Sequence, residues 1–349
     1  MKFRSFANSW VLAGLALALA SPASLQARDW RLYVDNSEGE NISIIDLNSM
    51  KVTGDINVGA PLIHGLALRP DGNLLLATVE SDHTLRWIDT RTNRITGSVK
   101  LTGRPNECAV TPDGRYAAVP IRDGNSVNIV DVVQKKIVKV LPIKEPHNAV
   151  STGSNRYLFV SSMGSDQINV IDLKTMSFSA LIPAGGRPRP YVVAPDGKTM
   201  YIAVSYLHGF TVVNIPEKKV LERVKMPAVR TGPPPPRKFE TPDTMTHGLA
   251  ITPDGKELWV TSLLDNCIYI YDIASKKFVG HLATGDGPNW IVFSPDGKYG
   301  CVSSTDSDDV SIYDVREHRQ VARIKVGRVP KRLAIGVVPG TENPRPAGL

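Results

Sequence analysis

Residues 64–101 read HGLALRPDGNLLLATVESDHTLRWIDTRTNRITGSVKL, and this stretch decides the fold. It divides into four short apolar segments, HGLALRP, NLLLATVE, TLRWIDT and ITGSVKL, which are separated by turn residues. Short runs of apolar and β-branched residues between Gly, Pro, Asp and Asn predict β-strands, and no apolar stripe of helical period competes with them. The stretch therefore predicts four antiparallel strands joined by tight turns.

The same pattern recurs along the chain about every 42 residues. One marker is a Pro-Asp-Gly turn, at 70–72, 112–114, 195–197, 253–255 and 295–297, with a degenerate copy at 152–155. A second marker closes the third segment of each unit and is acidic in all units but one, at Asp46, Asp89, Asp131, Asp172, Asn214, Asp272 and Asp314. The intervals of 43, 42, 41, 42, 58 and 42 residues give seven units, one of which carries an insertion of about 16 residues.

Four strands per unit and a period near 42 residues are typical of a β-propeller blade. The first unit lacks its first strand, whereas KRLAIGVV at 331–338 supplies a lone first strand near the other end. Pairing the two closes the ring and removes exposed strand edges. We therefore predict an all-β, seven-bladed β-propeller over residues 28–338, with four antiparallel strands per blade. Its C-terminal strand joins the N-terminal three-strand blade, and residues 339–349 form a tail.

The first 27 residues have the composition of a secretory signal peptide. Lys2 and Arg4 precede an apolar run from Trp10 to Ala20, which is too short to span a bilayer. Cleavage after Ala20 and cleavage after Ala27 both fit the small residues that follow the run. We expect a periplasmic or secreted protein without a transmembrane segment.

Charge and cysteine content exclude few functions. The formal charge is +7, and it falls to +5 when Lys2 and Arg4 leave with the predicted signal peptide. Because the basic residues are spread along the chain, we expect no sequence-specific nucleic-acid binding.

The three cysteines, Cys108, Cys267 and Cys301, lie in strand-like runs without metal-finger spacing. They fit buried small apolar residues, although a Cys267–Cys301 bridge stays an alternative.

Three units share a longer consensus: VGAPLIHGLALRPDG at 58–72, LTGRPNECAVTPDGRYAAV at 101–119 and ATGDGPNWIVFSPDGKYGCV at 283–302. This consensus resembles the YVTN-type β-propeller repeat, and the resemblance covers about residues 29–338. Similar repeats occur in exported surface proteins, lactonase-like propellers, the methylamine dehydrogenase heavy chain and the haem-binding propeller of periplasmic nitrite reductase. The resemblance implies the fold. Because those activities differ, function must be argued from the site.

The start of each blade's first strand marks the mouth of the central channel. The residue six positions before each Pro-Asp-Gly turn, or its equivalent, is polar in every unit; we name these the collar positions: His64, Asn106, His147, Arg189, His247, Asn289 and Lys331. We expect the residues next inward to be apolar, so that a polar collar lies above a packed channel.

Three collar positions are histidines, separated by two, two and three blades: His64, His147 and His247. Three imidazoles that converge from different sides are a recurrent ligand set for catalytic zinc and also suit Cu, Fe and Ni. They are the candidate ligands of a divalent metal, the one cofactor that the sequence suggests.

The other four collar positions favour an anionic ligand instead. Arg189 and Lys331 add positive charge, and the amides of Asn106 and Asn289 add hydrogen-bonding groups. A carboxylate, a phosphate, a lactone-derived acid or a haem propionate would suit this surface.

The insertion, residues 227–243, enters the strand that holds His247 and contains Pro233–Pro236. We expect it to lie over the channel mouth as a lid, a binding loop or a partner contact. Facing loops hold Tyr206 and His208, which are the candidate catalytic residues. Further polar candidates on these loops include Glu80, Asp82, His83, Arg122, Asp123, Asp265 and Asp306.

The sequence lacks a G-x-S-x-G elbow, an H-E-x-x-H motif and a C-x-x-C-H haem attachment. We predict an exported, monomeric binding protein whose collar face binds a small anionic or metal-containing ligand or docks a periplasmic protein partner. The alternative is a metal-dependent lyase or lactonase with a three-histidine metal site. In that enzyme Arg189 or Lys331 would neutralise the substrate acid, and Tyr206 or His208 would serve as the base.

Overall fold

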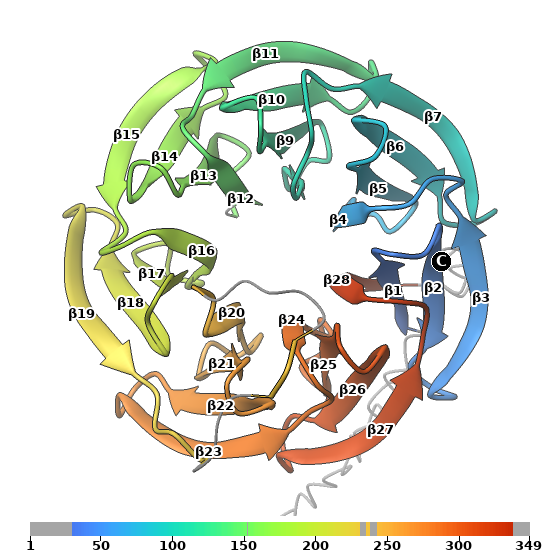
Figure 1. Cartoon of the computed structure of the whole chain (residues 1–349). Helices are drawn as coiled ribbons and strands as arrows, with labels where there is room; N and C mark the ends of the chain where they lie inside the picture. Colours follow the sequence, from blue (N-terminus) through green and yellow to red (C-terminus); the bar gives the residue numbers. More distant parts are fainter. Residues whose placement is uncertain (1–29, 152, 231–234, 238–242, 338–349) are drawn as a thin grey trace, which may run out of the picture.

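The structure is a computed structural model that forms a ring of seven blades around a central axis (Figure 1). It describes residues 30–151, 153–230, 235–237 and 243–337. Each blade is a four-stranded antiparallel sheet, and the described residues contain no helix. The predicted seven-bladed all-β propeller is confirmed. The predicted signal peptide and tail lie outside the described residues.

The strands of each blade follow one another from the channel to the rim. The innermost strands are β4 (Ile63–Leu68), β8 (Ala109–Val110), β12 (Pro146–Ser151), β16 (Pro188–Val193), β20 (Thr246–Ile251), β24 (Pro288–Phe293) and β28 (Pro330–Val337). The second strands are β5 (Leu74–Val79), β9 (Tyr116–Ile121), β13 (Tyr157–Ser162), β17 (Thr199–Val204), β21 (Glu257–Ser262), β25 (Tyr299–Ser304) and β1 (Trp30–Asn36). The third strands are β6 (Thr84–Asp89), β10 (Ser126–Asp131), β14 (Gln167–Asp172), β18 (Gly209–Asn214), β22 (Cys267–Asp272), β26 (Asp309–Asp314) and β2 (Asn41–Asp46). The outer strands are β7 (Arg94–Lys100), β11 (Lys136–Pro142), β15 (Ser177–Pro183), β19 (Lys219–Lys225), β23 (Lys277–Ala283), β27 (Arg319–Lys325) and β3 (Lys51–Asn57).

The ring closes as predicted, because β28 pairs antiparallel with β1 in a register that sets Leu32 opposite Ile335. Asp35 of β1 strengthens this closure. Its Oδ1 accepts hydrogen bonds from the backbone N–H of Lys331, at 2.8 Å, and of Arg332, at 2.7 Å. A strand that is remote in sequence is thus held to the N-terminal blade by both sheet and side-chain hydrogen bonds.

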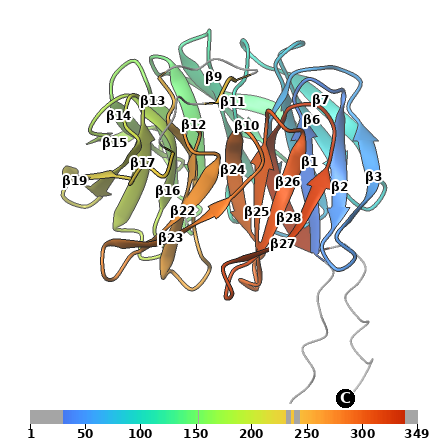
Figure 2. The same ribbon diagram turned by 60° about the horizontal axis from the view of Figure 1, so that its bottom comes forward.

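The Pro-Asp-Gly turns lie at the opposite end of the innermost strands from the collar. In the first of them the N–H of Gly72 donates to the Arg69 carbonyl at 2.8 Å, and Gly72 has a φ of 73°. This left-handed conformation favours glycine. The strand β4 therefore begins with Ile63 and His64 at its collar end and leads into this hairpin at its other end. Figure 2 shows the ring tilted, with its blades side by side.

The core consists of apolar clusters between neighbouring blades. Trp259 of β21 is fully buried and packs edge-on against Phe293, at 5.1 Å between ring centroids, and Tyr313, at 5.9 Å. All three cysteines are buried and unpaired, and each belongs to a different cluster. The prediction that they are small apolar core residues is confirmed, and the alternative Cys267–Cys301 bridge is not formed. Among the described residues, no helix is long and apolar enough to cross a membrane.

Candidate functional site at the channel mouth

The collar residues stand at the channel ends of the innermost strands or just before them, one in each blade. Five of them are buried and two are partly buried: His64, Asn106, His147, Arg189 and His247, then Asn289 and Lys331. A cavity of about 380 Å³ opens at this face, which we name the channel-mouth cavity. Five collar residues line it, namely His64, Arg189, His247, Asn289 and Lys331. Asn106 and His147 do not line it.

Positive charge dominates the wall of the channel-mouth cavity. Six cationic side chains line it: Arg104, Arg122, Arg189, Arg237, Lys331 and Arg332. Glu80 and Asp306 are the two carboxylates of the wall within the described residues. Because the space is partly enclosed by protein, these charges act through a lower dielectric than bulk water and attract an anion more strongly.

Carboxylates hold several of these cations in place. Glu80 contacts His64 and accepts a hydrogen bond from Nε of Arg104 at 2.7 Å. Although burial opposes its ionisation, the hydrogen bond with His64, together with the hydrogen bond and charge of Arg104, lowers the pKa of Glu80 to about 2. Arg189 pairs in the same way with Asp243, which also accepts a hydrogen bond from Ser205 Oγ at 2.9 Å.

The insertion contributes to the cavity through its described residues. Nη1 of Arg237 donates to Asn266 Oδ1 at 3.2 Å and lies 3.4 Å from Asp306 Oδ2. Arg237 and Thr244 both line the cavity. This end of the insertion therefore reaches the channel mouth, whereas residues 231–234 and 238–242 lie outside the described residues.

Each collar histidine uses its Nδ1 for a local hydrogen bond. His64 contacts the Glu80 carboxylate, His147 contacts the side-chain oxygen of Asn148, and His247 donates to the Asn289 carbonyl at 2.9 Å. Burial, followed by the charge of Lys331, lowers the pKa of His64 to about 3. Burial and nearby cations also lower the pKa of His147 and of His247 well below the usual value. All three rings are therefore neutral at neutral pH.

The three histidines do not form a set of metal ligands. His64 and His247 line the channel-mouth cavity, but His147 does not. Within the described residues, no three His, Cys, Asp or Glu side chains are grouped as metal ligands would be. The nearby cations also oppose a divalent metal, so the donor set does not fit the predicted metal site.

The residues next inward from the collar correct the prediction of an apolar channel. Glu107, Asn148 and Arg332 follow collar positions directly, and all three are buried. Nε of Arg332 lies 3.8 Å from Glu107 Oε1, and Asn148 Nδ2 donates to Glu107 Oε2. At three of the seven inward positions, a charged pair and its polar partner therefore stand where apolar side chains were expected.

The two candidate catalytic residues are not brought into the cavity. Tyr206 is 74% exposed and stands in a turn with a φ of 62°. His208 contacts Ser262 Oγ through Nε2 at 2.8 Å and lies 3.3 Å from Asp265. Neither side chain lines the cavity, whereas the loop candidates Glu80, Arg122 and Asp306 do.

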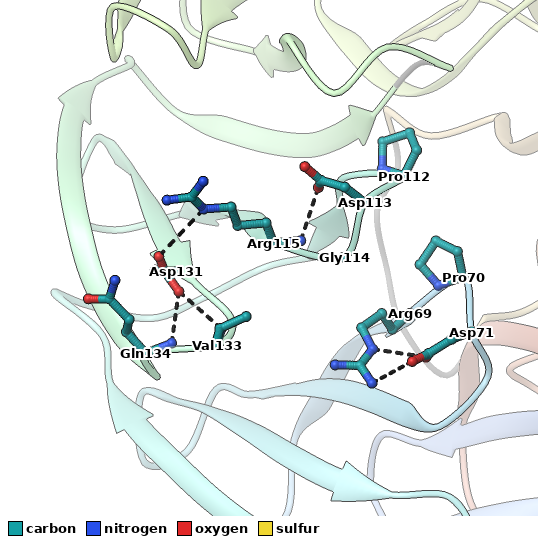
Figure 3. Close-up of a pocket in the computed structure, with 10 residues that line it drawn as sticks. All are labelled: Arg69, Pro70, Asp71, Pro112, Asp113, Gly114, Arg115, Asp131, Val133 and Gln134. Carbon is teal, nitrogen blue, oxygen red and sulfur yellow. Dashed lines mark hydrogen bonds and ion pairs between the residues drawn. The ribbon is translucent and has the colours of Figure 1, made fainter.

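A larger hollow of about 910 Å³ lies on the opposite face, between the Pro-Asp-Gly turns of two adjacent blades (Figure 3). Its polar groups serve the turns themselves. Arg69 donates to Asp71 from Nε at 2.8 Å, and Asp131 accepts from the backbone N–H groups of Val133 and Gln134. Because these groups are already satisfied locally, this hollow offers less to a ligand than the channel-mouth cavity.

Residues 113–329 match the family described as Lactonase, 7-bladed beta-propeller. The chain belongs to this family. The match spans more than half of the chain and agrees with the ring of seven four-stranded blades.

One curated relative and several solved structures are similar to this family member. Antigen Lp49 of Leptospira interrogans is 21% identical over 248 residues, which are 69% of this chain and 54% of the relative. The chain therefore spans about half the length of that protein.

A putative 6-phosphogluconolactonase from Bacteroides fragilis superposes with a TM-score of 0.72 at 16% identity, covering 90% of this chain and 100% of that one. The periplasmic gluconolactonase of Pseudomonas aeruginosa superposes with a TM-score of 0.71 at 20% sequence identity, covering 89% of this chain and 99% of that one. Hydrazine synthase of Kuenenia stuttgartiensis superposes with a TM-score of 0.67 at 18% sequence identity, covering 81% of this chain and 92% of that one. At these identities the likeness shows the fold alone.

Proposed function

We propose that the channel-mouth cavity binds a small anionic molecule and that this is the primary function of the protein. The observation that carries the proposal is the gathering of six cationic side chains around one partly enclosed space of about 380 Å³. That volume is near the lower end of the range for small-molecule sites. We further propose that the protein works in the periplasm or after secretion, as the N-terminal residues suggest.

The arrangement of charges supports an anion rather than a neutral sugar. The cations come from different blades and from the insertion, so they surround the cavity instead of forming one surface patch. Arg122 is exposed and makes no ion pair or side-chain hydrogen bond with another described residue. Its guanidinium is therefore available to a ligand.

Isothermal titration calorimetry with gluconate and with inorganic phosphate tests the proposal, with glucose as the neutral control. We expect both anions to bind, and we expect added salt to lower the affinity for each of them. Arg122→Gln should weaken binding about tenfold, which corresponds to the loss of one charge-assisted hydrogen bond. The matched control is Arg115→Gln, which removes an exposed arginine from the hollow on the opposite face and should leave affinity unchanged. Failure of every anion to bind, or an equal loss in both variants, would contradict the proposal.

A second candidate function is lactone hydrolysis in the same cavity, which the family membership and one local contact favour. His64 lines the cavity and its Nδ1 is held by the Glu80 carboxylate, which leaves Nε2 unprotonated. Water would attack the lactone carbonyl while Nε2 takes its proton. The ring C–O bond would then break, the ring oxygen would gain a proton, and a hydroxy acid would result. Glu80 would stabilise the imidazolium that forms, against the burial and the Lys331 charge that lower the pKa of His64.

Hydrolysis of glucono-δ-lactone, followed by pH-stat with the spontaneous rate subtracted, tests this candidate. We expect His64→Gln to lower kcat/KM at least about a hundredfold, which is the usual size of a general-base contribution. The same variant should retain gluconate binding within a few-fold. Activity that EDTA abolishes would instead support the metal-dependent alternative. Activity equal to wild type in His64→Gln would exclude His64 as the base.

A further inference from the structure

Arg332 forms a buried floor of the channel-mouth cavity. It is 1% exposed, stands on β28 and lines the cavity. Its Nη1 donates to Asn289 Oδ1 at 3.0 Å, and its guanidinium carbon lies 4.2 Å from the centroid of the Trp290 ring. A hydrogen bond at one end and an aromatic face below fix the plane in which the guanidinium lies.

The other edge of the same guanidinium has no hydrogen-bond partner. Nε and Nη2 are both buried, and neither is bonded to any described residue. Glu107 Oε1 lies 3.8 Å from Nε, which is beyond hydrogen-bond distance. Buried donors without acceptors are unfavourable, and because Arg332 lines the cavity, an acceptor on a ligand that reached this edge would be favoured.

Nε and Nη2 point in parallel from one side of the guanidinium plane. This fork matches the two oxygens of a carboxylate, which it can bind through two parallel N–H···O bonds. We propose, building on the anion site proposed above, that Arg332 is the specificity-determining residue and binds the carboxylate of a small organic acid side-on at the cavity floor. Asn289 and Trp290 are positioning residues that orient the guanidinium for this contact.

The charges around Arg332 favour a monoanionic carboxylate over a dianionic phosphate. Glu107 Oε1 lies 3.8 Å from Nε of Arg332, and Asp35 accepts a hydrogen bond from the Arg332 backbone N–H, so two carboxyl groups already lie close to this residue. Glu80, Asp243 and Asp306 likewise pair with cations of the cavity wall. Beside Arg332, a second negative charge on the ligand would therefore meet these carboxyl groups at close range.

Arg332→Lys tests the assignment because it keeps a positive charge but removes the fork. We expect gluconate affinity, measured by titration calorimetry, to fall at least about tenfold, while phosphate affinity falls less than about threefold. An equal loss for both anions, or unchanged gluconate affinity, would overturn the assignment. If the wild-type protein binds gluconate but Arg332→Lys binds it equally well, the anion site stands and only the role of Arg332 fails.

A second variant keeps the assignment testable where Arg332→Lys does not fold. Glu107→Gln removes the negative charge that competes for the fork, so gluconate should bind about threefold to tenfold more tightly. Unchanged or weaker binding in Glu107→Gln would mean that the ligand carboxylate does not approach Arg332. Wild-type protein that binds neither gluconate nor phosphate would overturn both this assignment and the anion site.

Discussion

At the scale of single residues, Glu107 and Arg332 distinguish this propeller's channel from an apolar one. Burial raises the pKa of Glu107 to about 7, although the charge of Arg332 and the hydrogen bond from Asn148 oppose the shift. Burial likewise raises the pKa of Asp35 to about 7, against the backbone hydrogen bond of Arg332 and the charges of Arg332 and Lys331. The channel interior therefore holds carboxyl groups whose protonation changes near neutral pH.

Glu107→Gln should abolish part of the pH dependence of stability. The folded-state pKa of about 7 exceeds the ordinary value of 4.5, so the folded protein retains this proton after the unfolded chain has lost it. Relative to its value at high pH, the free energy of unfolding is therefore larger below about pH 4.5, where Glu107 is protonated in both states. This added stability, on the order of 3 kcal/mol, is lost as the pH rises to about 7. Urea unfolding at pH 5 and pH 8 measures this effect. The variant should gain stability relative to wild type at pH 8, and an equal difference at the two pH values would refute the assignment.

At the scale of elements, the pairing of β1 with β28 decides whether the ring closes. Sheet hydrogen bonds join the two strands, and Asp35 adds an acceptor for two N–H groups of β28. No local sequence signal links residues separated by nearly 300 positions. The closure is therefore a long-range contact whose loop entropy must be overcome by the hydrogen bonds and by burial of Leu333.

Asp35→Ala should destabilise the protein by about 2–5 kcal/mol, because two buried backbone N–H groups lose their side-chain acceptor. Asp35→Asn is the matched control, since its side-chain oxygen can still accept both hydrogen bonds, and it should lose less. Urea unfolding gives the free energies, and hydrogen exchange of the Lys331 and Arg332 amides locates the change. Equal stability of the two variants, or unaltered exchange at these amides, would show that Asp35 does not hold the closure.

At the scale of the whole molecule, the ring brings together residues that are far apart in the chain. The collar positions recur about every 42 residues, yet one cavity gathers side chains from His64 to Arg332. The turns that mark the repeat lie on the opposite face, where their polar groups satisfy one another. One face thus carries the Pro-Asp-Gly hairpin turns, and the other carries the cationic channel-mouth cavity.

The sequence by itself determined the repeat, the strand order within a blade and the identity of the collar. These features are local: turn residues such as Gly72 and alternating apolar residues act over a few positions, and the period of 42 residues then sets the number of blades. Five of the seven collar residues indeed line the cavity, and the insertion contributes Arg237 to its wall.

Only the tertiary structure decided which polar side chains meet. Tyr206 was predicted as a catalytic residue but points to solvent, whereas Arg332, one position beyond the collar, becomes the cavity floor. The sequence shows that Glu107 and Arg332 both follow collar positions, but it does not show that they are in contact, because they are more than 200 residues apart in the chain. The direction of each side chain and its contacts with neighbouring blades depend on packing between segments that are far apart in the chain. The residue pattern of a single strand does not determine this packing.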